Sequence, residues 1–167
     1  MLLRRHTASC SDQLPAMGMK SRTMAEKFGR LALHTWTIDT TPLGIAVDAI
    51  RQAGYAAAEL RRTDFKRCYE AGMTNDQVLS MVKNSGVDVA VLGVEYGFMF
   101  ATGDENERIF KDFRVSCENA VALDCDMLMS APGPFSGPLK DAIGYLKKAG
   151  DIAGEYDLKL AIEFNSQ

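Results

Sequence analysis

The chain has 167 residues, of which 47% are hydrophobic and 25% are charged, and its formal net charge at pH 7 is −3. This length is sufficient for one globular domain with a buried core. Six basic and two acidic residues give residues 1–30 a charge of +4, so the remainder of the chain carries −7. An acidic body argues against nucleic acid as the main partner, because that binding depends on Lys and Arg side chains that neutralise phosphates.

The cysteines and the hydropathy pattern are typical of a cytoplasmic protein. The four cysteines show no C-x-x-C spacing, so we expect reduced thiols rather than a zinc knuckle or a disulfide framework. No apolar run approaches the ~20 residues that span a bilayer, so we expect no membrane partner. Residues 1–27 lack the apolar core of a secretory signal. We favour a disordered or spurious N-terminal extension over a transit peptide, and we place one domain at residues 28–167.

The predicted elements begin with a strand over residues 31–36. A helix follows, for which Thr41 is the predicted N-cap and Pro42 the first helical residue. Gly54 ends this helix, because glycine readily adopts the left-handed conformation found at helix ends. A run of small and apolar side chains over residues 55–60 predicts the second strand.

The alternation of strand and helix continues through the middle of the chain. Thr74 and Gln77 form the predicted capping box of a second helix, which Gly86 closes. A valine-rich run over residues 87–92 predicts the third strand. Apolar residues at helical spacing then predict a long helix over about residues 105–123.

Residues 126–130 and 158–164 predict the fourth and fifth strands, and Pro138 starts the helix between them. Helical spacing predicts one buried apolar face on that helix, formed by Leu139, Ala142, Ile143, Leu146, Ala149 and Ile152. The five strands recur about every thirty residues, which is typical of parallel strands joined by helical crossovers. No linker divides the chain after residue 30.

The two faces of three predicted strands differ in polarity. One face is apolar, and the other carries small residues and then polar or aromatic groups toward the carboxyl end: His34 and Trp36, Glu59 and Arg61, and Glu163. A barrel interior has this pattern, because polar groups collect at its mouth, whereas a sheet covered on both faces is apolar on both. We therefore predict an α/β fold, a partial (β/α)8 TIM barrel of five parallel strands alternating with helices.

Each of these side chains also has a structural alternative. Glu163 is a metal ligand and catalytic acid or base, or a strand-end carboxylate in a surface loop. Glu59 and Arg61 bind a substrate hydroxyl, or they pair with each other. His34 contacts substrate or is a satisfied core histidine, and Trp36 stacks on substrate or packs in the core.

Two loops bear on the choice of ligand. Residues 131–138 contain glycines but no following Lys-Ser or Lys-Thr pair, so we predict a strand-to-helix turn rather than a phosphate-binding P-loop. The absence of G-x-G-x-x-G after any strand argues against dinucleotide binding. Residues 97–103 are apolar and flanked by glycines, and they either close over a site as a lid or pack inward.

Three segments carry a family resemblance. Residues 54–61, 87–93 and 156–164 resemble the sugar phosphate isomerase/epimerase family of xylose isomerase-like TIM barrels, including its inosose isomerase branch. The resemblance covers about residue 28 to the end of the chain and implies a barrel truncated after its fifth strand. A complete barrel of this kind needs roughly 250 residues.

The resemblance implies a divalent metal, Mn, Mg or Zn, at the carboxyl mouth of the complete barrel. Its ligands are a glutamate after strand 5, an acidic residue after strand 6, a histidine after strand 7 and a glutamate after strand 8. Glu163 matches the first ligand, and the other three lie beyond Gln167. Glu59 matches an acidic residue of strand 2 near the substrate, and Asn165 is placed to add a polar contact. One carboxylate does not hold a catalytic metal, so we expect this chain alone to be inactive.

The implied reaction isomerises or epimerises a sugar, a sugar phosphate or an inosose-type hydroxy-ketone through an enediolate. One alternative is an inosose-type dehydratase on the same barrel, and another is an abasic-site endonuclease, which the acidic body disfavours. A third is a non-catalytic, five-stranded doubly wound domain that binds a ligand. Exposed edges on the first and fifth strands favour self-association.

Overall fold

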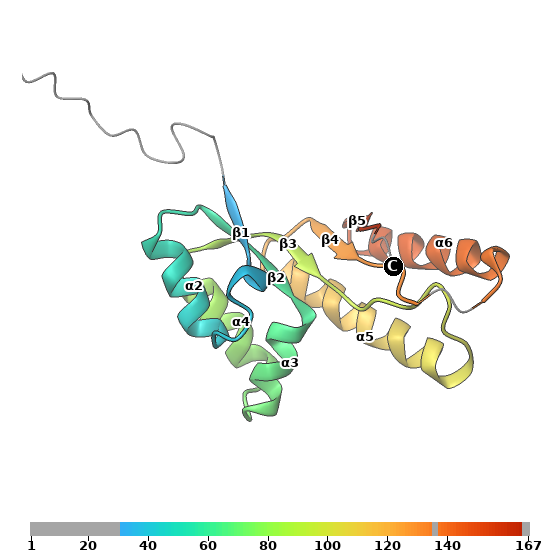
Figure 1. Cartoon of the computed structure of the whole chain (residues 1–167), viewed down its shortest axis with the longest axis horizontal. Helices are drawn as coiled ribbons and strands as arrows, with labels where there is room; N and C mark the ends of the chain where they lie inside the picture. The colour runs from blue at the N-terminus through green and yellow to red at the C-terminus, as the bar shows by residue number, and fades with distance from the viewer. Residues whose placement is uncertain (1–30, 135–136, 165–167) are drawn as a thin grey trace, which may run out of the picture.

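The computed structural model describes residues 31–134 and 137–164, and they form one parallel sheet with the strands in chain order (Figure 1). The strands are Ala32–His34 (β1), Ala57–Arg61 (β2), Asp88–Gly93 (β3), Met127–Ser130 (β4) and Lys159–Ile162 (β5). This sequential order confirms the predicted partial barrel. A doubly wound sheet instead reverses its strand order at a switch point. Within the described residues β1 and β5 are unpaired edges, and self-association through them stays a prediction.

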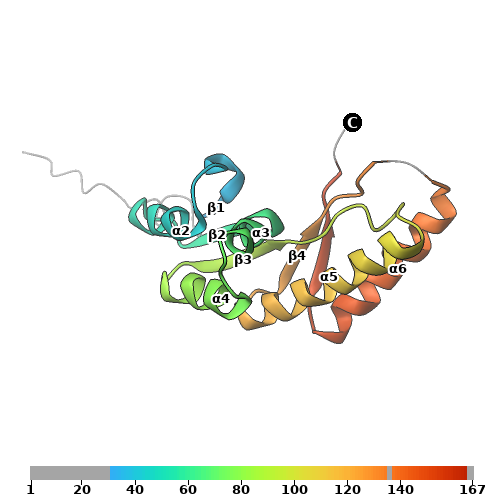
Figure 2. The same ribbon diagram turned by 90° about the horizontal axis from the view of Figure 1, so that it is seen from below.

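The helices connect successive strands. They are a 3₁₀ turn at Thr35–Ile38 (η1) and the α-helices Leu43–Gln52 (α2), Arg62–Glu70 (α3), Asn75–Asn84 (α4), Gly103–Ala122 (α5) and Leu139–Glu155 (α6). Figure 2 shows α4, α5 and α6 along one side of the sheet. The core lies between these helices and the strands, where Leu60, Phe113 and Leu128 are fully buried.

The start of the chain differs from its prediction at two points. The first strand ends at His34, and residues 35–38 turn into η1 instead of extending the strand. The helix α2 begins at Leu43 with Pro42 as its N-cap, not Thr41. Pro42 lies outside the helix, because its ψ of 139° is an extended conformation. The predicted N-terminal extension over residues 1–27 lies outside the described residues.

The helix α3 was not predicted. It follows β2 without a linker, and its N-cap residue is Arg61. Phe65 and Cys68 are its buried apolar side chains, at a spacing of three residues that is helical. Charged residues fill most of the rest of the helix, so its apolar signal is weak.

The capping box predicted for α4 is confirmed. The backbone N–H of Gln77 donates to Thr74 Oγ1 at 3.3 Å, and the backbone N–H of Thr74 donates to Gln77 Oε1 at 2.8 Å. Because these bonds satisfy N–H groups that the helix leaves unpaired, Thr74→Ala should lower the free energy of unfolding by about 1 kcal/mol. Urea unfolding measures this loss. Ser80→Ala, at an exposed position of the same helix, should change it by less than about 0.5 kcal/mol, and an equal loss would refute the capping role.

The predicted apolar face of α6 is only half covered. Ala142, Ala149 and Ile152 are buried as predicted, but three larger members are exposed: Leu139 at 64%, Ile143 at 63% and Leu146 at 38%. The helix packs against β5 and against α5 on one flank. In the described part of the chain no further helix covers the other flank.

The described cysteines fit the expectation of reduced thiols. Cys68, Cys117 and Cys125 are free and buried, and burial raises the pKa of Cys117 to about 11. They are therefore inert packing residues rather than nucleophiles. Among the described helices, none combines the length and the apolar character required to cross a membrane.

Candidate functional site

The carboxyl ends of the five strands lie along one edge of the sheet, because all the strands are parallel. His34 ends β1 and lies opposite Glu59 of β2 in the register. Glu163 directly follows β5, and its backbone N–H donates to Ser130 O at 2.8 Å. In α/β barrels this edge carries the active site.

His34 and Glu59 form the closest pair of predicted site residues. His34 Nε2 lies 3.7 Å from Glu59 Oε1, and the two side chains are 31% and 26% exposed. Nε2 is shielded from solvent and has no hydrogen-bond partner, so this is not a satisfied core histidine. The pair therefore keeps an unused polar atom beside a carboxylate at the carboxyl edge.

Trp36 was predicted to continue the polar face of β1. It lies instead on the 3₁₀ turn η1, after the strand has ended. Its side chain is 67% exposed, which argues against core packing. The rings of Trp36 and His34 meet edge to face, with centroids 6.1 Å apart and planes at 64°. Stacking of Trp36 on a substrate stays a prediction.

Arg61 pairs with Asp39 and Asp64 rather than with Glu59. Its Nη2 donates to Asp64 Oδ1 at 2.7 Å, its Nε donates to Thr35 Oγ1 at 3.1 Å, and its Nη1 donates to Asp39 Oδ1. The side chain of Arg61 is only 14% exposed. These contacts occupy N–H groups on all three guanidinium nitrogens of Arg61. Direct binding of substrate by Arg61 stays a prediction.

Four partners around Arg61 were missed in the sequence. Buried Asp64 accepts from Thr35 Oγ1 at 2.5 Å and from the backbone N–H of Arg61 at 2.9 Å. Arg67 Nη1 donates to Asp39 Oδ1 at 3.2 Å and to the Asp39 carbonyl oxygen. Hydrogen bonds from Arg61, and then from Arg67, hold the pKa of the Asp39 carboxyl below its ordinary value. The one signal in the sequence was Asp64 at the third position after Arg61, which is typical of a helix start.

Glu163 lies away from the His34–Glu59 pair along the sheet. The pair is on β1 and β2, and β3 and β4 lie between β2 and β5. Its side chain is exposed. Among residues 31–134 and 137–164, no three His, Cys, Asp or Glu side chains gather as a potential metal site. This donor set does not fit a catalytic cation, which needs three or more protein ligands. Asn165 lies outside the described residues.

The segment over residues 97–103 packs inward rather than forming a lid. Phe98 is fully buried, and its ring centroid lies 5.8 Å from that of Phe110 and 6.1 Å from that of Phe113. Asn106 Nδ2 donates to the carbonyl oxygens of Phe98 and Ala101 at 3.1 and 3.0 Å. The loop after β3 is thereby fixed to the start of α5.

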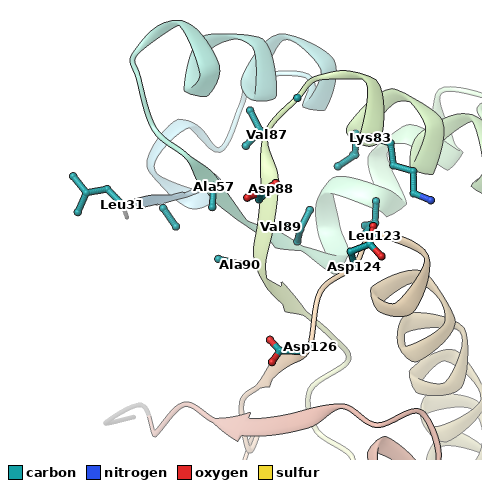
Figure 3. A pocket seen from close by; sticks show the side chains of 13 residues that line it. Leu31, Ala57, Lys83, Val87, Asp88, Val89, Ala90, Leu123, Asp124 and Asp126 are labelled. Atoms are coloured by element: carbon teal, nitrogen blue, oxygen red, sulfur yellow. The ribbon is translucent and has the colours of Figure 1, made fainter. Parts of the chain in front are cut away.

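A pocket lies at the opposite, amino-terminal end of the strands (Figure 3). It has a volume of about 890 Å³, and Leu31, Ala57, Asp88 and Asp126 are among its lining residues. It opens beside β3, because the register of β3 with β4 begins only at Leu92. In barrels this end serves stability, and we do not place the site there.

The comparisons with known proteins agree with this geometry. Residues 47–165 match the family model described as xylose isomerase-like TIM barrel, and the chain belongs to that family. No curated protein matches the chain.

Solved structures share the fold at low sequence identity. The IolI protein with a bound zinc atom has a TM-score of 0.68 at 19% identity, over 81% of this chain and 51% of that one. A sugar phosphate isomerase/epimerase from Parabacteroides distasonis has a TM-score of 0.58 at 12% identity, over 82% and 51%. The 3-keto-D-glucoside 4-epimerase from E. coli has a TM-score of 0.58 at 12% identity, over 78% of this chain and 54% of that one. The chain therefore spans about half the length of these structures.

Proposed function

We propose that this chain supplies the first five βα units of a metal-dependent isomerase or epimerase. Its substrate is a sugar, a sugar phosphate or an inosose-type hydroxy-ketone. The observation that carries the proposal is the partly exposed His34–Glu59 pair, which lies at the carboxyl edge of a barrel of this family. Small-molecule sites place a few convergent polar side chains in this way.

The residues have separate roles in this proposal. Glu163 is the carboxylate that would contribute one ligand to a divalent cation in the complete barrel, and it would move a proton beside the substrate carbonyl. His34, Glu59 and Asn165 hydrogen-bond substrate hydroxyls, and Trp36 covers an apolar face of the substrate. A divalent cation, Mn, Mg or Zn, belongs to the complete barrel, since the described residues lack a ligand set for it. The 167-residue chain alone is therefore inactive in this proposal. The protein to which it belongs is placed in the cytoplasm.

The dehydratase alternative begins with the same proton removal next to a carbonyl. It differs in the product, because a hydroxyl group leaves as water. The reaction product therefore separates the two activities, and both need the carboxylate of Glu163.

Proton exchange in D₂O tests the proposed function. The intact mass of the native gene product is measured first and compared with the 18.3 kDa of this chain. The native product is then incubated with inososes, ketoses and ketose phosphates and with Mn²⁺, Mg²⁺ or Zn²⁺. Nuclear magnetic resonance detects exchange of the C–H beside the carbonyl. A product longer than this chain should catalyse metal-dependent exchange, and Glu163→Gln should slow it by about 10² or more.

The matched control is Asp157→Asn, an exposed acid just before the same strand, at the opposite end from the site. It should leave the exchange rate unchanged. Unimpaired exchange in Glu163→Gln would contradict the role of that residue. Strong metal-dependent exchange by the 167-residue chain would contradict its proposed inactivity, and a native product of 18.3 kDa without exchange would contradict an enzymatic function.

A further inference from the structure

A group of five side chains joins the start of the chain to β2 and α3. We call it the Arg61 clamp, and its members are Thr35, Asp39, Arg61, Asp64 and Arg67. Arg61 donates hydrogen bonds to three of the others, Thr35, Asp39 and Asp64, as described above. Asp64 is 6% exposed and Arg61 is 14% exposed, so the centre of the clamp is largely shielded from water. Charge-assisted hydrogen bonds are strong and geometrically specific in such surroundings.

The clamp acts on η1. This turn has four residues, and its N-cap residue His34 makes no side-chain capping hydrogen bond. A single 3₁₀ turn has little stability of its own, so contacts with the rest of the fold must hold it. Thr35 at its start is bound by Asp64 and Arg61, and Asp39 at its end is bound by Arg61 and Arg67. Both ends of the turn are thus attached to β2 and α3.

Between these two attachments stands Trp36. The side chain of Trp36 is 67% exposed, so its apolar ring is accessible to a ligand. Its neighbour His34 carries the unpaired Nε2, and Glu59 lies 3.7 Å from that atom. Figure 2 shows η1, in blue, on the side of the sheet opposite α4 and α5. An exposed apolar ring thus stands beside two partly exposed polar side chains, which is the composition of a small-molecule site.

We propose that Arg61 is a positioning residue, which holds η1 so that Trp36 forms a fixed wall against the C–H face of a sugar or polyol ring. Glu59, whose side chain is 26% exposed, then accepts a hydrogen bond from a hydroxyl group at the edge of that ring. The inference rests on the proposed function for its ligand class, and it gives Arg61 an indirect role in place of direct contact. A rigid aromatic wall binds a ring at low entropic cost, because no side chain has to be ordered on binding.

The single tryptophan of the chain makes the clamp measurable without a ligand, because all tryptophan fluorescence comes from Trp36. Time-resolved anisotropy of the unsubstituted 167-residue chain should show little fast local motion. Arg61→Lys keeps the charge but loses the planar fork, so a fast component should appear while the far-ultraviolet circular dichroism stays native. Arg51→Lys is the matched control, since Arg51 forms an exposed ion pair with Asp48 on α2. It should leave the anisotropy unchanged.

If Arg61→Lys does not fold, Asp39→Asn provides the same test from the exposed end of the clamp, where Asp39 is 41% exposed. Its loss of charge weakens both arginine contacts, so it should also release Trp36. Unchanged anisotropy in a folded variant overturns the clamp.

Titration with myo-inositol then tests the wall. In the native protein a millimolar series should change the Trp36 emission saturably, beyond the change in a glycerol series of matched viscosity. Arg61→Lys should raise the dissociation constant about tenfold, a loss of about 1.4 kcal/mol. Saturable binding that Arg61→Lys leaves unchanged overturns the positioning role. An emission that does not respond to the polyol overturns the wall, whereas the proposed function is decided by the exchange experiment in D₂O. A release of Trp36 in the ligand-free variant still supports the clamp.

Discussion

Phe113→Ala is expected to lower the free energy of unfolding by about 3–5 kcal/mol. Phe113 lies on α5, is fully buried and packs against Phe98 of the loop after β3. Its loss removes apolar contacts and leaves a cavity between the helix and the loop. Domains are stable by only about 5–15 kcal/mol, so this variant should lose most of its stability.

Urea unfolding followed by circular dichroism measures the loss. Val115→Ala is the matched control, because Val115 lies on the same helix and is 42% exposed. It should change the stability by less than about 0.5 kcal/mol. A similar loss in both variants would show that α5 does not contribute the core contact assigned to Phe113.

Gly133→Ala is expected to destabilise the carboxyl edge of the sheet, where the loops after β3 and β4 cross. Gly133 has φ of +76°, and a Cβ there would lie 2.6 Å from the Cα of Gly97. A left-handed conformation costs a non-glycine residue about 1–3 kcal/mol, and overpacking adds about 1–3 kcal/mol. The expected loss is therefore about 2–6 kcal/mol.

The same substitution at Gly144 provides the control. Gly144 lies within α6, and a Cβ there would meet no atom within 4 Å. Because alanine favours the helix, Gly144→Ala should stabilise the protein by about 0.5–1 kcal/mol. Opposite signs for the two variants, measured by urea unfolding, would support the crossing of the loops. A neutral Gly133→Ala would show that the loops separate freely.

The class of fold followed from local patterns. Apolar spacing predicted the long helix α5, and Thr74 and Gln77 marked the start of α4. Parallel order followed from the regular alternation of strand and helix. Such features are readable because they depend on residues within a few positions of one another.

The missed features depend on distant residues instead. The helix α3 carries Phe65 and Cys68 among charged side chains, and it packs against α2 and α4 as well as bonding to Arg61. The strand β1 ends at His34, and Thr35 at the start of η1 donates to Asp64 across 29 positions of sequence. No local pattern contains that information.

The candidate site divides in the same way. Alternation along single strands was sufficient to select His34, Glu59 and Glu163 as polar groups at carboxyl ends. Which of them meet was settled by strand register, which brings His34 beside Glu59 and leaves Glu163 at the other edge of the sheet. Arg61 shows the same dependence, since its partners Asp39 and Asp64 come from separate elements. Periodicity identifies the side chains that leave the core, but only packing in three dimensions determines what each one contacts.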